Sequence, residues 1–237
     1  MLKVNKIFKS IKDKKIISDI AFDINFGEIF GLLGPNGAGK TSTFYIIAGL
    51  TRADKGNIIL ESKDISKMPM HVRSNLGLKY LPQEPSIFLN LSVMDNLYGL
   101  AELSFKSKKE IKRYIDETIE EFDLSDITSL KGRQLSGGQR RKVEIARTLA
   151  SKPKIILLDE PFAGIDPIAI DDIKNVLVSL SKKDIGILIT DHNVRETLEI
   201  CNNAAIINEG KIIAQGDANS LTKNDIVKRV YLGNMYS

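Results

Sequence analysis

One glycine-rich stretch decides the fold of this chain, and it reads Gly34-Pro35-Asn36-Gly37-Ala38-Gly39-Lys40-Thr41. The stretch has the G-x-x-x-x-G-K-[ST] spacing of a phosphate-binding loop. The apolar run that ends at Leu33 predicts a buried strand before the loop, and the unbroken run from Ser42 to Ala48 predicts a helix after it. Because a strand, a loop and a helix follow one another in this order, a simple glycine-rich turn is a poor alternative.

The residue types in this loop suit the binding of a nucleoside triphosphate. Glycines allow the backbone N–H groups to point at phosphate oxygens, and the N-terminus of the following helix adds unpaired N–H groups and partial positive charge. The Lys40 ammonium would lie near the β- and γ-phosphates, and the Thr41 hydroxyl would ligate magnesium. The loop alone does not show what the energy of the nucleotide is used for.

Composition limits the class of protein. The chain has 237 residues, 43% of them hydrophobic and 27% charged, which fits one large soluble domain or two small ones with an apolar core. Its 34 basic and 30 acidic residues give a net charge of +4, which is too mild and diffuse to favour nucleic-acid binding over a solvated, lysine-rich surface. We therefore expect no nucleic-acid partner.

Cysteine usage and hydropathy indicate the compartment. Cys201 is the single cysteine, so we expect a reducing cytosol and neither a disulfide framework nor a metal cluster. No run of sequence approaches the ~20 apolar residues that span a bilayer, and Met1 to Ser10 lacks the apolar core of a signal peptide. We expect contact with a membrane only through a partner.

Hydrophobic periodicity predicts a mixture of strands and helices. Residues 1–26 alternate apolar and polar side chains, which predicts two or three antiparallel strands with a turn near Lys12-Asp13-Lys14. The stretch from Val93 to about Phe122 carries isoleucines at helical spacing and predicts a helical segment, whereas 73–77 is expected to be a connection. Further strands are predicted at 56–60 and 185–190, and the stretch 78–81 leads to Pro82-Gln83-Glu84-Pro85.

A second glycine motif, Leu135-Ser136-Gly137-Gly138-Gln139, opens a predicted helix that runs to Ala150. Ser136 and the two glycine N–H groups would again face an anion at a helix N-terminus. This pentapeptide, downstream of a phosphate-binding loop, resembles the signature of ATP-binding cassette (ABC) ATPases. The resemblance implies that two chains pack head to tail around two ATP molecules, each signature facing the nucleotide of the other chain.

Two adjacent carboxylates follow the apolar run Ile155 to Leu158. Acids at the end of a buried strand are costly unless they have a function, although capping of a following helix is an alternative because Pro161 comes next. Asp159 matches the Walker B aspartate, which implies that it holds magnesium through water. Glu160 matches the catalytic glutamate, which implies that it orients and polarises the attacking water.

Three further motifs match the family in the same order along the chain. Gln83 matches the Q-loop glutamine that contacts magnesium and the attacking water, although an exposed loop glutamine is an alternative. Asp166, in Ala163-Gly164-Ile165-Asp166, matches the D-loop that crosses the dimer interface. His192 directly follows a predicted strand and matches the switch histidine at the γ-phosphate, whereas His71 has no such context. The predicted ATP-binding residues are Gly34, Pro35, Asn36, Gly37, Ala38, Gly39, Lys40, Thr41 and Ser42, with Ser136, Gly137, Gly138 and Gln139 acting on the ATP of the partner chain.

Longer segments resemble the ATPases of lipopolysaccharide export systems, namely 81–88, 160–167, 190–198 and 228–233. The resemblance implies a cytoplasmic homodimer under two transmembrane permease subunits at the inner membrane. This assembly would extract lipopolysaccharide and drive its export to the outer membrane. The resemblance also implies that Phe88 lies in the groove that receives a helix of the permease.

The chain departs from these ATPases at two places. The position of the aromatic residue that stacks on adenine falls on Ile11, whereas Phe8 lies three residues earlier, so either residue could contact the base. Leu89 and Asn90 follow Phe88, where a basic residue is common in the family.

The expected fold is an α/β P-loop NTPase of the ABC type. A RecA-like core with an antiparallel β layer is expected to comprise 1–86 and 154–237, and a helical subdomain is expected at about 87–153. The expected function is ATP hydrolysis with Mg²⁺, coupled to lipopolysaccharide export. The alternatives are the ATPase of another transporter, such as a branched-chain amino acid importer, a soluble ABC ATPase acting on DNA or ribosomes, and a binding module without hydrolysis.

Overall fold

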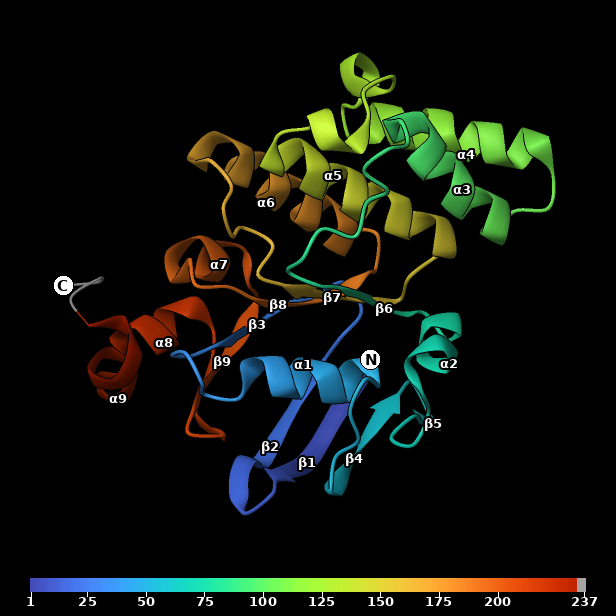
Figure 1. Ribbon diagram of the computed structural model, residues 1–237. Coiled ribbons are helices and arrows are strands. Elements are labelled where there is room, and N and C mark those ends of the chain that lie inside the picture. Colours follow the sequence, from blue (N-terminus) through green and yellow to red (C-terminus); the bar gives the residue numbers. More distant parts are fainter. Residues whose placement is uncertain (234–237) are drawn as a thin grey trace.

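Two β-sheets with helices between and above them form the fold of this chain (Figure 1). The computed structural model describes residues 1–233. Within that range one sheet has the order β2-β1-β4-β5 and is antiparallel. Its strands are β1 (Leu2–Ile11), β2 (Lys14–Ile24), β4 (Lys55–Leu60) and β5 (Lys63–Asp64).

The other sheet has the order β10-β9-β3-β8-β7-β6 and carries the predicted site residues. Its neighbouring strands run parallel from β9 to β6, and β10 pairs with β9 in the antiparallel direction. Parallel strands have their carboxyl ends at one edge of the sheet, so the loops that follow them meet there. The strands are β3 (Ile29–Leu33), β6 (Leu78–Leu81), β7 (Ile155–Asp159), β8 (Gly186–Thr190), β9 (Asn203–Asn208) and β10 (Lys211–Gly216).

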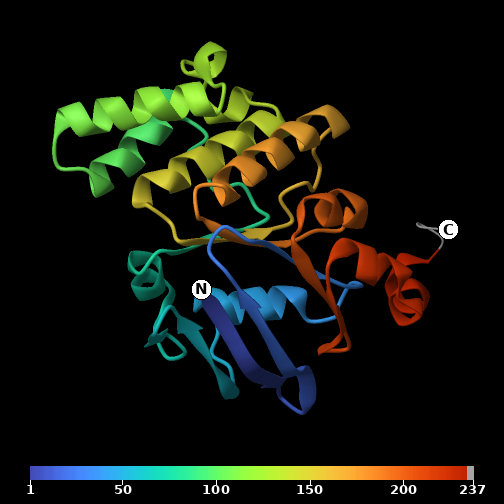
Figure 2. The same cartoon turned by 180° about the vertical axis from the view of Figure 1, so that it is seen from behind.

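Helices divide the apolar interior into layers. Helix α1 (Lys40–Ala48) lies between the two sheets, and its Phe44, Ile46 and Ile47 are buried in a cluster that draws on both sheets. A second cluster lies on the opposite face of the parallel sheet, beneath the helices that Figure 2 shows stacked above it from behind. Those helices are α3 (Val93–Ser104), α4 (Lys108–Glu121), α5 (Gly137–Thr148) and α6 (Pro167–Ser181).

Smaller helices complete the described chain. Helix α2 (Met70–Asn75) precedes β6, and α7 (Val194–Ile200) leads from β8 to β9. Helices α8 (Ala218–Lys223) and α9 (Asp225–Val227) follow β10 and pack in a third cluster with Leu33 and Val194. In the part of the chain that the structure describes, no helix has the length and apolar character needed to cross a bilayer.

The α/β architecture and the antiparallel strands before the phosphate-binding loop are confirmed. The helical pattern predicted over 93–122 is present but broken into α3 and α4, because Ser107 caps a new helix in a capping box with Glu110. Residues 82–154 hold α3 to α5 with short 3-10 turns and loops. The division into a core and a helical subdomain at residues 87 and 153 stays a prediction.

The prediction of a connection at 73–77 is wrong, because α2 extends to Asn75. Arg73 explains the helix: it is 1% exposed, and its guanidinium donates to the carbonyl oxygens of Ile46 and Ile47 at 2.7 and 2.6 Å. These carbonyls belong to the last turn of α1, where helical hydrogen bonding leaves acceptors free. Tertiary contacts, not local periodicity, therefore fix α2.

Candidate active site

The phosphate-binding loop connects β3 to α1, as the sequence predicts. Gly34 has φ +152°, and a Cβ atom there would lie 2.0 Å from the carbonyl oxygen of Ile207 on β9, so only glycine fits. Asn36 and Gly37 are exposed at the tip of the loop, whereas Ala38 and Gly39 are buried. No side chain caps the start of α1 at Gly39, which leaves the first N–H groups of the helix for a ligand.

Lys40 places a cation inside this loop. The side chain is 7% exposed, and its Nζ donates to the carbonyl oxygens of Gly34 and Pro35 at 2.7 and 3.1 Å. Burial lowers the pKa of Lys40, while the nearby carboxyl groups of Glu160 and Asp159 oppose that shift. A partly desolvated ammonium among free N–H groups suits an anionic ligand such as a phosphate.

The structure brings together the residues expected to bind magnesium. Thr41, Gln83 and Asp159 line one pocket of about 270 Å³. Asp159 ends β7 and is 6% exposed, and burial raises the pKa of its carboxyl group. Hydroxyl, amide and carboxylate oxygens are the hard ligands that Mg²⁺ prefers. Among the described residues no group of three His, Cys, Asp or Glu side chains is placed to hold a metal ion.

Glu160 and His192 meet at the ends of neighbouring strands. Asp159 is in register with Thr190, and the N–H of Glu160 donates to the carbonyl oxygen of Thr190 at 2.8 Å. The Nε2 atom of His192 lies 2.6 Å from Oε1 of Glu160. Glu160 has φ +46°, a left-handed conformation that is uncommon for a residue with a side chain and that recurs at functional sites.

Asp191 fixes the loop that carries His192. It is 1% exposed, and its two carboxylate oxygens accept hydrogen bonds of 2.8 Å from the N–H groups of Phe162 and Asn193. The loop after β8 is therefore tied to the loop after β7, which carries Glu160. The sequence motif identifies the histidine but not the role of this aspartate, although the position of Asp191 directly after a buried strand was a usable signal.

The signature motif forms the start of α5. Ser136 is the N-cap, and it exchanges hydrogen bonds with Gln139 in a capping box. Ser136 and Gly137 are exposed, whereas Gly138 is buried against α6. A pocket of about 180 Å³ is lined by Gly137, Gln83 and Glu160, among others, and none of Gly34 to Ser42 lines it.

Asp166 and Phe88 both lie at the surface. Asp166 is the N-cap of α6 and accepts a hydrogen bond of 3.0 Å from the N–H of Ala169. Phe88 is 55% exposed, with the Arg147 guanidinium 5.5 Å from the centre of its ring. The buried Asn96 holds the backbone of Phe88, accepting from its N–H at 2.9 Å and donating to its carbonyl at 3.1 Å.

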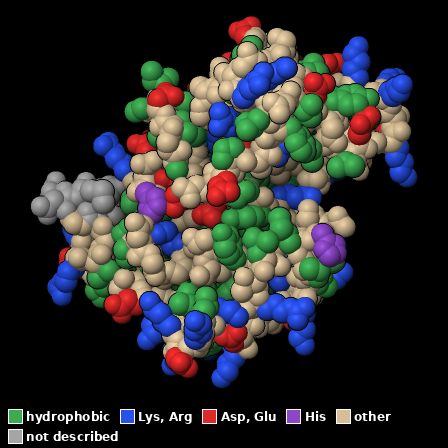
Figure 3. All heavy atoms as spheres, viewed as in Figure 1, with side chains coloured by type: hydrophobic (Ala, Val, Ile, Leu, Met, Phe, Trp, Pro, Cys, Tyr) green, Lys and Arg blue, Asp and Glu red, His purple; other side chains and the backbone are tan. Residues whose placement is uncertain are grey.

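A hydrophobic surface lies between α1 and the upper helices. Figure 3 shows hydrophobic side chains gathered there, beside acidic groups, in the middle of this face. Tyr45 and Leu50 are 40% and 50% exposed, and they line the pocket that also holds Thr41 and Asp159. The exposed apolar surface therefore adjoins the predicted metal site.

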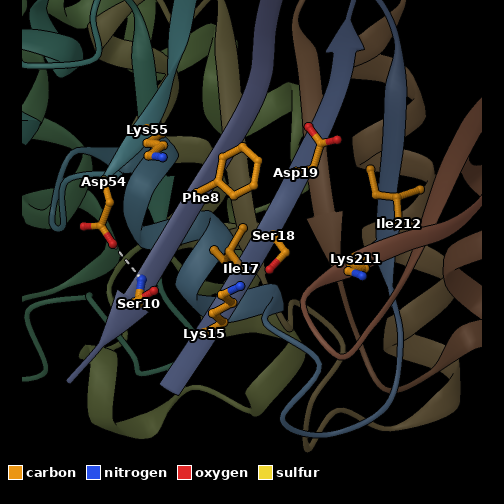
Figure 4. Close-up of a pocket in the computed structure, with 10 residues that line it drawn as sticks. All are labelled: Phe8, Ser10, Lys15, Ile17, Ser18, Asp19, Asp54, Lys55, Lys211 and Ile212. Atoms are coloured by element: carbon orange, nitrogen blue, oxygen red, sulfur yellow. Dashed lines mark hydrogen bonds between the residues drawn. The ribbon is translucent and has the colours of Figure 1, made fainter. Parts of the chain in front are cut away.

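Phe8 points into a different pocket, of about 670 Å³, shown in Figure 4. Ile17, Lys15 and Lys211 also line it. Ile7 is fully buried in the cluster that contains α1, and side chains alternate along a strand, so the adjacent Phe8 faces away from α1. Ile11 has the same parity as Ile7 and is 57% exposed.

Comparisons with known proteins identify the family of this chain. The family model described as "ABC transporter" matches residues 17–163. The chain is 51% identical to the lipopolysaccharide export system ATP-binding protein LptB of Haemophilus influenzae, with 100% of this chain and 98% of that protein covered. It is 48% identical to LptB of Escherichia coli K12, with 98% and 97% covered.

Solved structures show the same fold. The ADP conformation of an ATP-binding cassette of an ABC transporter matches with a TM-score of 0.87 and 28% identity, covering 98% of each chain. The cbiO1 subunit from Clostridium perfringens matches with a TM-score of 0.86 and 28% identity, covering 98% of this chain and 94% of that one. The chain belongs to the ABC transporter family, as one of its ATP-binding cassette ATPases.

Proposed function

We propose that this chain is the motor subunit of a lipopolysaccharide exporter and that it hydrolyses ATP with Mg²⁺ as a homodimer. The contact of 2.6 Å between Glu160 and His192, beside Asp159, carries the catalytic part of the proposal. Identity of 46–51% over essentially the whole chain to proteins named for lipopolysaccharide export supports the choice of substrate. The same identity does not favour an amino acid importer or a soluble ABC ATPase.

In this proposal the residues Gly34 to Ser42 hold the phosphates of ATP. Thr41 and Asp159 would hold the magnesium ion, with Gln83 completing its surroundings, and a bound ion would supply positive charge that neutralises the phosphates. When ATP binds, Lys40 gives up its hydrogen bonds to the loop carbonyls and contacts the phosphates instead. Hydrolysis then depends on positioning and charge neutralisation, which the loop and its N–H groups supply.

Glu160 activates the attacking water. Its carboxylate accepts a hydrogen bond from the water and orients it in line with the γ-phosphorus. A bond forms between the water oxygen and phosphorus, a proton of the water passes to the Glu160 carboxylate, and the bond from phosphorus to the bridging oxygen breaks, so that ADP and phosphate leave. His192, held through Asp191, contacts the γ-phosphate from the loop after β8.

A second copy of the chain completes each site. Ser136, Gly137, Gly138 and Gln139 of one chain would face the ATP bound by the other, and Asp166 would lie at the interface. The pocket at the signature contains none of the phosphate-loop residues, so the two anion-binding surfaces of one chain do not form one pocket. A solved bacterial ABC transporter cassette, 21% identical to this chain, is dimeric.

The proposed membrane partner is a pair of permease subunits, which this chain would bind at the cytoplasmic face of the inner membrane. Phe88, Leu89 and Leu91 are 55%, 46% and 44% exposed and form an apolar surface on the loop before α3. Exposed aromatic and aliphatic side chains of this kind anchor protein interfaces. Arg147 lies over the Phe88 ring, so a basic group is present although no basic residue follows Phe88 in sequence.

Affinity purification of this chain from gently solubilised membranes tests the proposal. Two related permease subunits that bind lipopolysaccharide should co-purify with it, and Phe88→Glu should lose them while the isolated chain still hydrolyses ATP. Co-purification of a different permease would contradict lipopolysaccharide as the transported substrate, but it would leave the proposed ATP hydrolysis unchanged. Recovery of the chain without any membrane partner would contradict the export role.

A further inference from the structure

Tyr80 reaches the predicted metal site from the edge of the parallel sheet. On β6, Tyr80 is in register with Leu157 of β7, two residues before Asp159. Residues two apart on a strand share a face, and a diagonal neighbour lies within reach of an aromatic side chain. The Tyr80 hydroxyl accordingly donates a hydrogen bond of 3.1 Å to Oδ2 of Asp159.

This hydrogen bond fixes how the carboxylate is turned. A carboxylate on the short aspartate side chain rotates freely unless its oxygens are bonded. Tyr80 engages Oδ2, which leaves Oδ1 free for water or a metal ion in the pocket shared with Thr41 and Gln83. Groups of this kind, which orient a metal ligand without touching the metal, tune metal affinity.

Tyr45 holds the ring of Tyr80 from the other side. The two rings meet edge to face, with centroids 6.3 Å apart and an angle of 84° between their planes. Tyr45 lies one helical turn after Thr41 on α1, so the residue that supports Tyr80 and the predicted metal ligand share one face of the helix. The support of Asp159 is therefore built from β6 and α1 together.

We propose that Tyr80 is a positioning residue for the magnesium site, because its hydroxyl holds Asp159 in the orientation that the metal ion needs. The inference rests on the proposed metal-dependent hydrolysis of ATP. It adds a residue outside the recognised motifs and assigns the Tyr45–Tyr80 ring contact the task of holding that residue in place.

Tyr80→Phe tests this directly, because it keeps the ring and its contact with Tyr45 and removes only the hydroxyl. The probe is Mn²⁺, titrated into the protein–ADP complex and followed by electron paramagnetic resonance. We expect Mn²⁺ affinity to fall roughly tenfold, the lower end of the effect usual for groups that orient a metal ligand. ADP binding in EDTA should stay as in the wild type, since no metal contributes there.

Steady-state kinetics supply a second readout. The apparent KM for Mg²⁺ should rise by a similar factor in Tyr80→Phe, whereas kcat at saturating Mg²⁺ should remain close to wild type. A structural defect would instead lower kcat at every Mg²⁺ concentration and weaken ADP binding in EDTA, and that pattern would overturn the positioning role.

Tyr114→Phe is the matched control. The Tyr114 hydroxyl also donates one hydrogen bond, of 3.0 Å, but to the carbonyl oxygen of Ala146 in the helical layer. This variant should bind Mn²⁺ as the wild type does. If the wild type depends on a divalent metal and Tyr80→Phe binds Mn²⁺ as tightly as the wild type does, the positioning role of Tyr80 is refuted and the proposed function stands. If the wild type hydrolyses ATP without any divalent metal, the proposed function is refuted too.

Discussion

His192 and Glu160 are in contact, with Nε2 of the histidine 2.6 Å from Oε1 of the glutamate. They follow adjacent parallel strands, β8 and β7, whose last residues are in register. Glu160 is the less exposed of the two, with 14% of its side chain accessible against 51% for His192. The pair thus has a half-buried carboxylate and an accessible imidazole, which suits a base beneath a group that meets the nucleotide.

Glu160→Gln should abolish turnover while ATP binding is retained. The amide keeps the shape of the side chain and can still orient water, but it cannot serve as an anionic hydrogen-bond acceptor, so the rate should fall by about 100-fold or more. Phosphate release measures the rate, and size-exclusion chromatography with ATP should detect a trapped dimer. Normal turnover in this variant would show that Glu160 is not the base.

Ile11→Tyr should tighten ATP binding. Ile11 shares its strand face with Ile7, whose side chain packs toward α1, and an aromatic ring there would offer the adenine a stacking platform. Stacking contributes about 0.5–1.5 kcal/mol, which corresponds to roughly a 2- to 10-fold lower Kd by titration calorimetry.

Phe8→Ala is the control for that experiment. Because Phe8 faces the pocket of Figure 4 and points away from α1, its removal should leave the Kd for ATP unchanged. A clear loss of affinity in Phe8→Ala, with no gain in Ile11→Tyr, would mean that Phe8 contacts the base.

Gly138→Ala should destabilise the protein and weaken the signature. A Cβ atom at Gly138 would lie 2.4 Å from the Cβ of Ala169 on α6, so the two helices would have to separate. Overpacking of this kind costs about 1–3 kcal/mol, or roughly 2–12 °C in melting temperature for a chain of this size. Thermal denaturation followed by circular dichroism measures the shift.

Gly99→Ala provides a control in which the expected change in stability has the opposite sign. Gly99 lies within α3, and nothing is within 4 Å of the Cβ position. Alanine has the higher helix propensity, so this variant should gain about 0.5–1 kcal/mol. If both substitutions lowered the melting temperature equally, close packing against α6 would not explain the glycine in the signature.

The chemistry-bearing motifs could be predicted because each is contiguous in sequence and follows a strand. The loop at Gly34, the acids after β7 and the histidine after β8 are placed by parallel strands whose carboxyl ends meet at one edge. The alternation of apolar residues likewise predicted β1 and β2. Local sequence patterns were sufficient to predict the position of a residue wherever that position depends only on its own strand and on the pairing of neighbouring strands.

Supporting contacts could not be predicted, because their partners are far apart in sequence. Tyr80 bonds Asp159 across 79 positions, and Arg73 bonds the end of α1 across 27. Asn96 looked like an ordinary polar residue of a helix, yet it is fully buried and holds the backbone of Phe88. Such residues obtain their role from tertiary packing, and a single sequence carries no periodic signal for them.

Lys174 joins α6, which follows Asp166, to α7, which follows His192. Its ammonium lies 2.8 Å from Asp171 on α6 and 2.6 and 2.7 Å from Glu196 and Glu199 on α7, and 10% of the side chain is exposed. Lys174→Met would keep the aliphatic stem and leave three unpaired carboxylates close together. We expect a loss of about 1–2 kcal/mol, or roughly 2–8 °C in melting temperature.

The pH dependence of this loss follows from the lysine. Burial alone would lower the pKa of Lys174, but hydrogen bonds to Asp171, Glu196 and Glu199 together raise it above its ordinary value. A cation whose pKa is raised on folding stabilises the fold fully below its unfolded pKa, near 10.5, and the contribution disappears only as pH passes the higher folded pKa. The difference in unfolding free energy between wild type and Lys174→Met should therefore be constant from about pH 7 to 9.

Lys183→Met is the control, because it breaks a more exposed ion pair, with Glu121. This variant should lose at most about 1 kcal/mol of unfolding free energy. An equal loss in both variants would contradict a special role for Lys174.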